Sequence, residues 1–194
     1  CYSGPLDSSV AKAMMECDPR GPLVIHCVKM YASPDGQSFY TFGRIYSGTV
    51  RAAETVRVLG EGYSPEDDED AAVATVEAVA VPRGRSRTNI TIAKAGNWVL
   101  LEGVDANIAK TATIVGTNVD PHVAEEFQIF SPLKFPQAGG ESVMKLAMEP
   151  LNPAELPKMV EGLRRVSKAY PMVKTKVEES GEHVLLGTGE LYMD

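Results

Sequence analysis

The side chains that could do chemistry are few in this sequence and lie far apart. His26, His122 and His183 show no spacing typical of a metal site or a catalytic triad. A packed position in a strand is favoured for His26, an orienting hydrogen bond for His183, and solvent exposure for His122. No G-x-x-x-x-G-K-[ST] loop occurs, so no backbone nest is expected to hold β- and γ-phosphates. The prediction is a segment with no catalytic, cofactor-binding or metal-binding residue.

Two charged loops are the better candidates for contacts with RNA or protein. The segment EGYSPEDDED (61–70) carries six acidic side chains, which repel one another and must be solvated. It is either a solubilising insertion or a docking surface for a basic partner. The segment PRGRSR (82–87) could bind RNA phosphates, or its arginines could pair with the acidic run. The contact candidates are Glu66, Asp67, Asp68, Glu69, Asp70, Arg83, Arg85, Arg87 and His183.

Composition restricts the setting in which this chain works. Its 194 residues are 44% hydrophobic and 23% charged, which is typical of a folded protein, and its net charge of -7 disfavours a chain that wraps nucleic acid over its whole surface. Cys1, Cys17 and Cys27 indicate neither a disulfide framework nor a zinc site, so a reducing compartment is expected. No apolar run is long enough to cross a bilayer. Because the chain begins at Cys1, we expect it to be part of a longer protein.

The first part of the chain predicts a β-barrel. Residues 7–17 form a short amphipathic pattern that indicates a leader helix, and the proline- and glycine-rich segment 18–22 ends it. Seven β-rich runs then follow, separated by turn residues. They are LVIHCVKM, FYTFGRIYSG, TVRVLG, AAVATVEAVAV, TNITIA, NWVLLEGV and KTATIV. So many strands without an intervening helix predict a closed antiparallel barrel or a sandwich.

The last part of the chain predicts a different domain. VMKLAMEP (143–150) is a strand, Asn152 caps a helix whose stripe of Leu156, Met159, Leu163 and Val166 faces a core, and 172–187 is a hairpin. This order is the opening of a ferredoxin-like α+β domain, incomplete here. The predicted organisation is a leader helix and linker over 1–21, a β-barrel over 22–118, a connector over 119–140 and a truncated α/β domain over 141–194.

Several motifs resemble one protein family. FGRIYSG (42–48), VRVLG (56–60) and AGNWV (95–99) are similar to the second domain of translational GTPases, a β-barrel. NPAELPKMVEGLRRVSK (152–168) and EESGEHVLLGTGE (178–190) resemble the third domain of the elongation factor 2 group. The resemblance covers nearly the whole chain from Cys17. Ala53 departs from it, because it occupies a turn where the family usually has glycine, and residues 78–84 match poorly.

The details favour one branch of that group. The acidic loop 60–70, GTGELY (187–192) and the segments 2–18 and 167–171 are more similar to the spliceosomal GTPases of the U5 small nuclear ribonucleoprotein than to the ribosomal translocase. The resemblance implies a nuclear protein with GTP and Mg²⁺ in a preceding domain. It implies as partners a large U5 scaffold protein, the U5 helicase, U5 small nuclear RNA and other spliceosome components, and no membrane. These domains would relay nucleotide state during spliceosome activation and disassembly.

Three alternatives remain open from the sequence. The chain could come from the ribosomal translocase and act in translation elongation. It could be a self-standing enzyme, in which case the isolated chain would turn over a substrate. It could also be a purely architectural part whose hydrogen exchange does not respond to the nucleotide bound by the whole protein.

Overall fold

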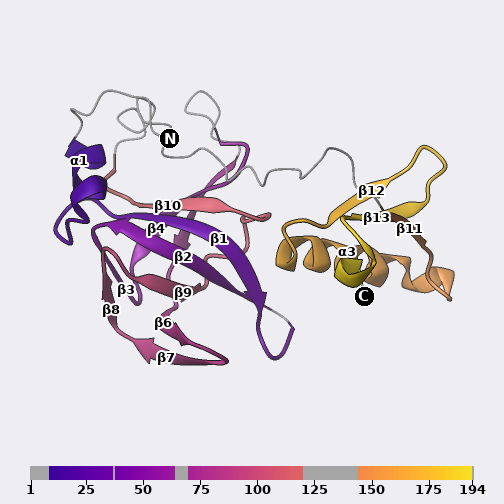
Figure 1. Ribbon diagram of the computed structural model, residues 1–194, viewed down its shortest axis with the longest axis horizontal. Coiled ribbons are helices and arrows are strands. Elements are labelled where there is room, and N and C mark those ends of the chain that lie inside the picture. Colours follow the sequence, from indigo (N-terminus) through magenta and orange to yellow (C-terminus); the bar gives the residue numbers. More distant parts are fainter. Residues whose placement is uncertain (1–8, 37, 64–69, 120–143, 194) are drawn as a thin grey trace. The chain divides into compact units, whose positions relative to one another are not determined.

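The computed structural model describes residues 9–36, 38–63, 70–119 and 144–193, and divides the chain into a first unit over Cys1–Leu133 and a second over Lys134–Asp194. Figure 1 shows both units, with strands dominating the first. The connector expected at 119–140 falls almost wholly outside the described residues, as do Cys1 and His122.

A short helix precedes the strands of the first unit. Helix α1 spans Ser9–Glu16 and buries Val10. It ends in a Schellman motif, in which Cys17 N–H donates to Met14 O at 3.3 Å and Asp18 N–H donates to Ala13 O at 2.9 Å. Cys17 takes the left-handed conformation that this motif requires, with φ of 51°. The leader helix predicted over 7–17 is confirmed within the described residues.

Ten strands make up the rest of the first unit. Eight form one antiparallel sheet in the order β5-β4-β10-β1-β2-β9-β6-β7, and β3 pairs with β8 as a separate ribbon. The strands are β1 (Val24–Ala32), β2 (Phe39–Ser47), β3 (Thr49–Arg51), β4 (Thr55–Leu59), β5 (Ala71–Thr75), β6 (Ala78–Arg83), β7 (Ser86–Ile90), β8 (Ile92–Lys94), β9 (Trp98–Glu102) and β10 (Ala112–Gly116).

The sheet is not the closed barrel that the sequence predicted. Among the described strands, β5 and β7 lie at the two ends of the order and do not pair with each other. The run 71–81 is two strands rather than one: Val76 N–H donates to Glu54 O and Glu77 N–H donates to Glu102 O, so the chain leaves β4 and joins β9 within two residues. The chain between β5 and β6 therefore joins the two sides of the sheet by a bend, and no strand-to-strand hydrogen bonds among the described residues close it. β7 is polar and almost wholly exposed, whereas β5 is apolar and only partly exposed.

Strict alternation in β2 separates the core from the outer surface. Phe39, Thr41, Gly43, Ile45 and Ser47 are buried, whereas the residues between them are half-exposed. Successive side chains of a strand point to opposite faces, so β2 presents its apolar and small residues inward. Ile25, Ile45, Val99 and Leu101 come from neighbouring strands and are each 0% exposed. This core positions the outward-facing side chains of β1, β2 and β9.

The second unit has one helix against a three-stranded antiparallel sheet in the order β11-β13-β12. Only Leu163 of the predicted stripe is buried; it packs with Val173 and Leu185, while Leu156 and Val166 are exposed. Three residues after Asn152, Glu155 forms an ion pair with Lys158, with Nζ and Oε1 3.4 Å apart. The elements are β11 (Met144–Met148), η2 (Pro153–Glu155), α3 (Leu156–Ala169), β12 (Lys174–Val177), β13 (His183–Gly187) and α4 (Glu190–Met193).

The strand order of the second unit is compatible with a split β-α-β arrangement, since β13 lies between the two strands that α3 connects. A ferredoxin-like domain needs a second full helix and a fourth strand. Neither occurs among the described residues, where α4 is a single turn. The ferredoxin-like assignment therefore stays a prediction.

Ala53 keeps the turn geometry of a glycine. It lies between β3 and β4 with φ of 64°, and its N–H donates to Val76 O at 2.7 Å. A Cβ is disfavoured in this left-handed region because it approaches the following carbonyl oxygen. Ala53 thus adopts the left-handed backbone that glycine favours, and this conformation strains the turn locally.

An Ala53→Gly variant should be more stable than the wild-type chain by about 1 kcal/mol, because relief of the left-handed strain exceeds the entropy that glycine adds to the unfolded state. Urea unfolding of the 194-residue chain measures the difference. Ala52→Gly is the matched control: Ala52 has no positive φ, so this change should destabilise by about 0.4–1 kcal/mol. Equal effects of the two substitutions would contradict the strain at Ala53.

Candidate nucleic-acid interface

The acidic loop is closed at its base by its own residues. Asp70 O accepts the Gly60 N–H at 2.9 Å, and Asp70 Oδ2 accepts the Gly62 N–H at 2.8 Å. At the other side of the base, Glu61 Oε1 accepts the Thr111 N–H at 3.0 Å. Asp70 and Glu61 thus have structural partners. The other predicted acidic candidates, Glu66, Asp67, Asp68 and Glu69, lie outside the described residues.

The three arginines of the basic loop have different surroundings. Arg83 ends β6 and Arg85 lies in the turn after it; both are exposed, and no carboxylate among the described residues pairs with either. Arg87, in β7, forms an ion pair with Glu102 of β9. Its guanidinium also lies 3.9 Å from the ring centroid of Tyr40. Arg87 therefore pairs across the sheet and not with the described part of the acidic run.

His183 lies in the other unit, at the start of β13, where its register partners are Met148 and Val177. Within the described part of the chain its ring makes no hydrogen bond, so the orienting bond expected from the sequence is not found. The predicted contact residues consequently do not form one site. Of the predicted contact residues that the structure describes, only Arg87 reaches a cluster of other side chains.

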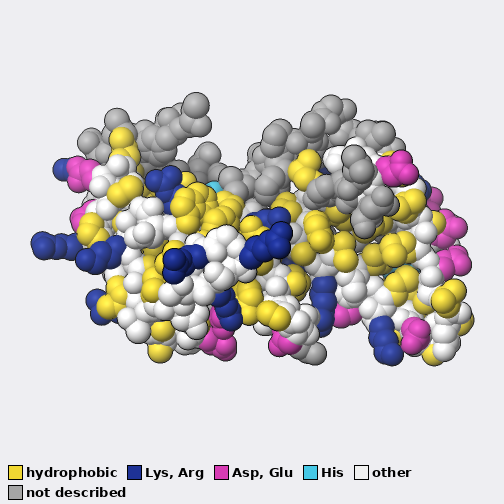
Figure 2. Space-filling view, turned by 60° about the horizontal axis from the view of Figure 1, so that its bottom comes forward, with side chains coloured by type: hydrophobic (Ala, Val, Ile, Leu, Met, Phe, Trp, Pro, Cys, Tyr) yellow, Lys and Arg dark blue, Asp and Glu magenta, His cyan; other side chains and the backbone are white. Residues whose placement is uncertain are grey.

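That cluster is a surface on the outside of the sheet, which we call the aromatic-cationic face. It consists of exposed or half-buried side chains from β1, β2, β7 and β9, and in β2 these alternate strictly with buried residues. In the view of Figure 2, Lys and Arg side chains of the first unit stand among hydrophobic ones. The members of the face are Lys29, Tyr31, Tyr40, Phe42, Arg44, Tyr46, Arg87, Trp98 and Glu102.

Three aromatic rings form a connected row across β1, β2 and β9. Phe42 and Trp98 are stacked, with ring centroids 4.9 Å apart and an interplanar angle of 14°. Tyr31 meets Phe42 edge-on at 5.9 Å. Tyr31 is 44% exposed and Trp98 is 42% exposed, so the two outer rings have free surface while Phe42 supports them. Exposed aromatic rings on a rigid sheet are stacking platforms for nucleic-acid bases.

Cationic side chains accompany the rings. Lys29 Nζ lies 5.1 Å from the centroid of Tyr31, and the guanidinium of Arg44 lies 5.3 Å from that of Tyr46. Arg44 Nε is buried without a hydrogen-bond partner within the described ranges, and no described carboxylate pairs with Arg44 or Lys29. The one carboxylate on the face, Glu102, is neutralised by Arg87. The face is therefore positive, although the whole chain carries a net charge of -7.

His26 lies next to this face on β1, and its ring centroid is 6.4 Å from that of Tyr46. Burial lowers the pKa of His26, because a half-buried imidazolium loses hydration. Below the ordinary histidine value of about 6.5, the unfolded chain then binds more protons than the folded one. The contribution of neutral His26 to the free energy of unfolding is therefore present above that pH and is lost as the pH falls below it.

We therefore expect a His26→Gln variant to have a smaller loss of stability between about pH 7 and pH 5 than the wild type, because it removes the proton uptake that favours unfolding. Urea unfolding at a series of pH values measures how the free energy of unfolding changes with pH. A variant whose stability falls with pH as steeply as that of the wild type would contradict the assignment to His26.

The described residues offer no site for a metal or a nucleophile. They contain no group of three or more His, Cys, Asp or Glu side chains that could hold a metal ion. Burial raises the pKa of the Cys27 thiol, so it stays protonated and unreactive. None of the described helices has the length and apolar character needed to cross a bilayer.

The sequence contained a signal for this face that motif reading did not use. Residues 40, 42, 44 and 46 alternate with the core positions of β2 and are Tyr, Phe, Arg and Tyr. A strand with one buried face normally exposes polar residues on the other, so aromatic and cationic residues there indicate a binding surface. Which residues of β1 and β9 adjoin them could not be read, because that depends on strand register.

Comparison with known proteins provides independent information on the family. The family model described as elongation factor Tu domain 2 matches residues 38–115, which supports the translation-factor domain II type of the first unit. The match begins just before β2 and extends almost to the end of β10. It thus contains most of the strands that carry the aromatic-cationic face.

Longer relatives match the entire chain. It is 52% identical over 193 residues to the 109 kDa U5 small nuclear ribonucleoprotein component GFL of Arabidopsis thaliana, and 51% identical to the 110 kDa component CLO of the same organism. It is 49% identical over 197 residues to the pre-mRNA-splicing factor cwf10 of Schizosaccharomyces pombe. Each match covers 100% of this chain and 19% of the relative, so the chain spans about a fifth of their length.

Proposed function

Because this chain belongs to the family of U5 small nuclear ribonucleoprotein components within the translational GTPase superfamily, we propose that it supplies the middle domains of a spliceosomal GTPase. The observation that carries this proposal is sequence identity. It is 49–52% along the whole chain to three proteins that are named as U5 components or as a splicing factor. On this proposal the protein works in the nucleus, in pre-mRNA splicing.

The proposed role is to relay and to dock, not to catalyse. The sequence has no P-loop, so GTP and Mg²⁺ would be held by a preceding domain of the whole protein. The two units would transmit its nucleotide state during spliceosome activation and disassembly. The proposed partners are the large U5 scaffold protein, the U5 helicase and U5 small nuclear RNA. The proposed hinge is the segment 116–127, which overlaps the start of the predicted connector, because interdomain linkers absorb rotation.

The aromatic-cationic face is the proposed docking surface for single-stranded RNA. Two half-exposed rings, Tyr31 and Trp98, can each stack on a base, and Lys29 and Arg44 can meet phosphates without first breaking an ion pair to a described carboxylate. A protein partner that bound mainly through charge would not need the stacked row. These observations favour RNA as the ligand.

Affinity purification of the full-length protein from nuclear extract tests the family role. U5 small nuclear RNA should be recovered together with splicing proteins. The ribosomal translocase is the competing assignment, and recovery of ribosomal subunits in place of U5 RNA would establish it. The relay is tested separately by hydrogen exchange of the GTP- and GDP-bound protein, since identical protection over these domains would leave only an architectural role.

A further inference from the structure

We propose that the free edge of β5 is a docking site for an extended, basic peptide segment of a partner protein, which binds as an added antiparallel or parallel strand. Strand addition to an exposed edge uses backbone hydrogen bonds for affinity and side chains for specificity. The site lies in the first unit, consists of Ala71–Thr75 and its flanking carboxylates, and does not depend on RNA binding at the aromatic-cationic face.

The hydrogen-bond pattern identifies which backbone groups are free. β5 pairs with β4 only, from Leu59↔Ala71 to Thr55↔Thr75. Gly60 N–H donates to Asp70 O and Val76 N–H donates to Glu54 O. The backbone N–H and C=O groups of the even-numbered residues in this stretch therefore point toward β4. Hydrogen-bonded and non-hydrogen-bonded residue pairs alternate in an antiparallel ladder. Ala71, Val73 and Thr75 belong to the non-hydrogen-bonded pairs, so their backbone N–H and C=O groups point away from the sheet.

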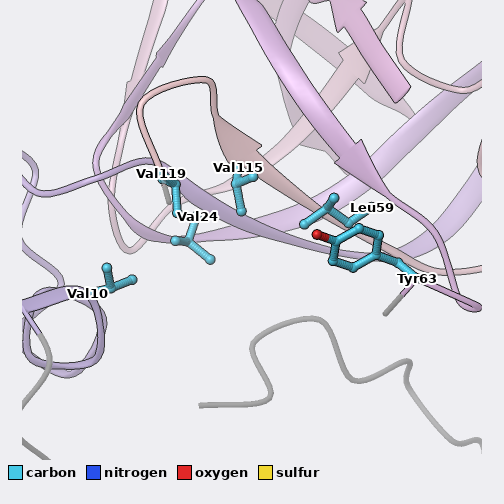
Figure 3. Close-up of a cluster of buried hydrophobic side chains, with 6 residues drawn as sticks. All are labelled: Val10, Val24, Leu59, Tyr63, Val115 and Val119. Carbon is cyan, nitrogen blue, oxygen red and sulfur yellow. The ribbon is translucent and has the colours of Figure 1, made fainter. Parts of the chain in front are cut away.

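The free part of this edge is short and well supported. Ala71 packs against the buried cluster of Val10, Val24, Leu59, Tyr63, Val115 and Val119 shown in Figure 3, which fixes the start of the strand. At the other end, a Cβ on Gly103 would lie 2.7 Å from Thr75 O, so the chain after β9 approaches there. Ala71 and Val73 therefore form the accessible edge, with Val73 68% exposed.

β5 is short, but it lacks the other features that usually prevent pairing at an edge. Proteins protect exposed edges with charged side chains, prolines or bulges. The sequence AAVAT contains neither a charge nor a proline, and its ladder with β4 is regular over five residue pairs. The edge strand at the other end of the sheet, β7, carries Arg87 and follows Pro82 of β6. Only one of the two edges is open to strand addition.

Charge indicates the kind of peptide that fits. Asp70 precedes β5 and Glu77 follows it, both exposed, and Glu54 lies across from Val76. Arg57, opposite Val73, is the one cation on β4 or β5. The sequence adds four acidic residues directly before Asp70, although they lie outside the described residues and are not part of the site. A peptide strand is complementary to these groups when it has an apolar residue that packs on Val73 and Lys or Arg beside that residue.

The test uses the 194-residue chain and a capped peptide probe of about seven residues, Lys-Val-Lys-Val-Lys-Val-Lys, whose valines can pack on Val73. Fluorescence anisotropy should show binding that weakens with salt. An acidic probe with Glu for Lys, and a probe N-methylated at alternate residues on the pairing side, should each bind at least about tenfold more weakly. Equal binding by either would overturn the proposal.

Two protein variants and one direct readout complete the test. Val73→Pro removes the outward N–H at a position where proline is tolerated, and should weaken the basic probe by about tenfold, whereas Val73→Thr should keep the affinity. In the wild-type chain, bound probe should slow hydrogen exchange at the amides of Ala71 and Val73 and leave those of Ala72 and Ala74 unchanged. Unaltered exchange at Ala71 and Val73 would overturn strand addition even if Val73→Pro failed to fold.

Discussion

A Tyr31→Ala/Trp98→Ala double variant should bind single-stranded RNA at least about 30-fold more weakly than the wild-type chain. Each base that stacks on an aromatic side chain contributes about 1–3 kcal/mol, as judged by alanine substitution, so loss of two platforms removes at least about 2 kcal/mol. Fluorescence anisotropy with an oligouridylate of about ten nucleotides at a fixed, stated salt concentration measures the affinity.

Folding and specificity need separate controls in that experiment. Because Tyr31 and Trp98 both contact Phe42, the double variant should lose some stability, and its thermal unfolding must show that it is folded at the temperature of the binding assay. Tyr170→Ala removes an aromatic residue that is 50% exposed in the second unit, and should leave the affinity unchanged. Trp98→Phe keeps a ring on Phe42 and should restore most of the binding that Trp98→Ala loses. An unchanged affinity in the double variant would exclude this face as the RNA surface.

Gly48→Ala should be among the most destabilising single substitutions, with a loss of about 2–5 kcal/mol. Gly48 connects β2 to β3 with φ of 79°, and a Cβ there would lie 2.6 Å from Leu23 Cα and 2.8 Å from Leu23 N. Those are backbone atoms, which cannot rotate away. The peptide groups on both sides are also fixed, since Gly48 N–H donates to Asp18 O and Gly48 O accepts the Ala95 N–H.

Gly84→Ala separates the two causes of that loss. Gly84 also has a left-handed backbone, with φ of 61°, but nothing lies within 4 Å of the Cβ position. Gly84→Ala should therefore lower the free energy of unfolding only by the cost of a left-handed backbone at alanine, about 1 kcal/mol. Urea unfolding of both variants gives the difference, which reports the collision with Leu23. Equal losses would show that conformation alone makes Gly48 necessary.

The sequence by itself determined the features that depend on local pattern. The β-rich run FYTFGRIYSG predicted a strand, which β2 confirms, and FGRIYSG placed that strand in its family. Asn152 is a cap, since its Oδ1 accepts the Ala154 N–H at 3.1 Å, although it caps the short turn η2 that leads into α3 and not α3 itself. These features could be read because side-chain direction in a strand and capping at a helix start involve residues close together along the chain.

Only the tertiary structure decided which distant residues meet. Tyr31, Phe42 and Trp98 form one row because β1, β2 and β9 pair in a particular register, which a bulge between Cys27 and Lys29 helps to set. The sequence left open whether Arg87 would pair with the acidic run, and register gave it Glu102. The same holds for the open edge of β5, which exists because the chain bends at Val76. Pairing register depends on loop length, bulges and the packing of the whole sheet, and no short stretch of sequence contains that information.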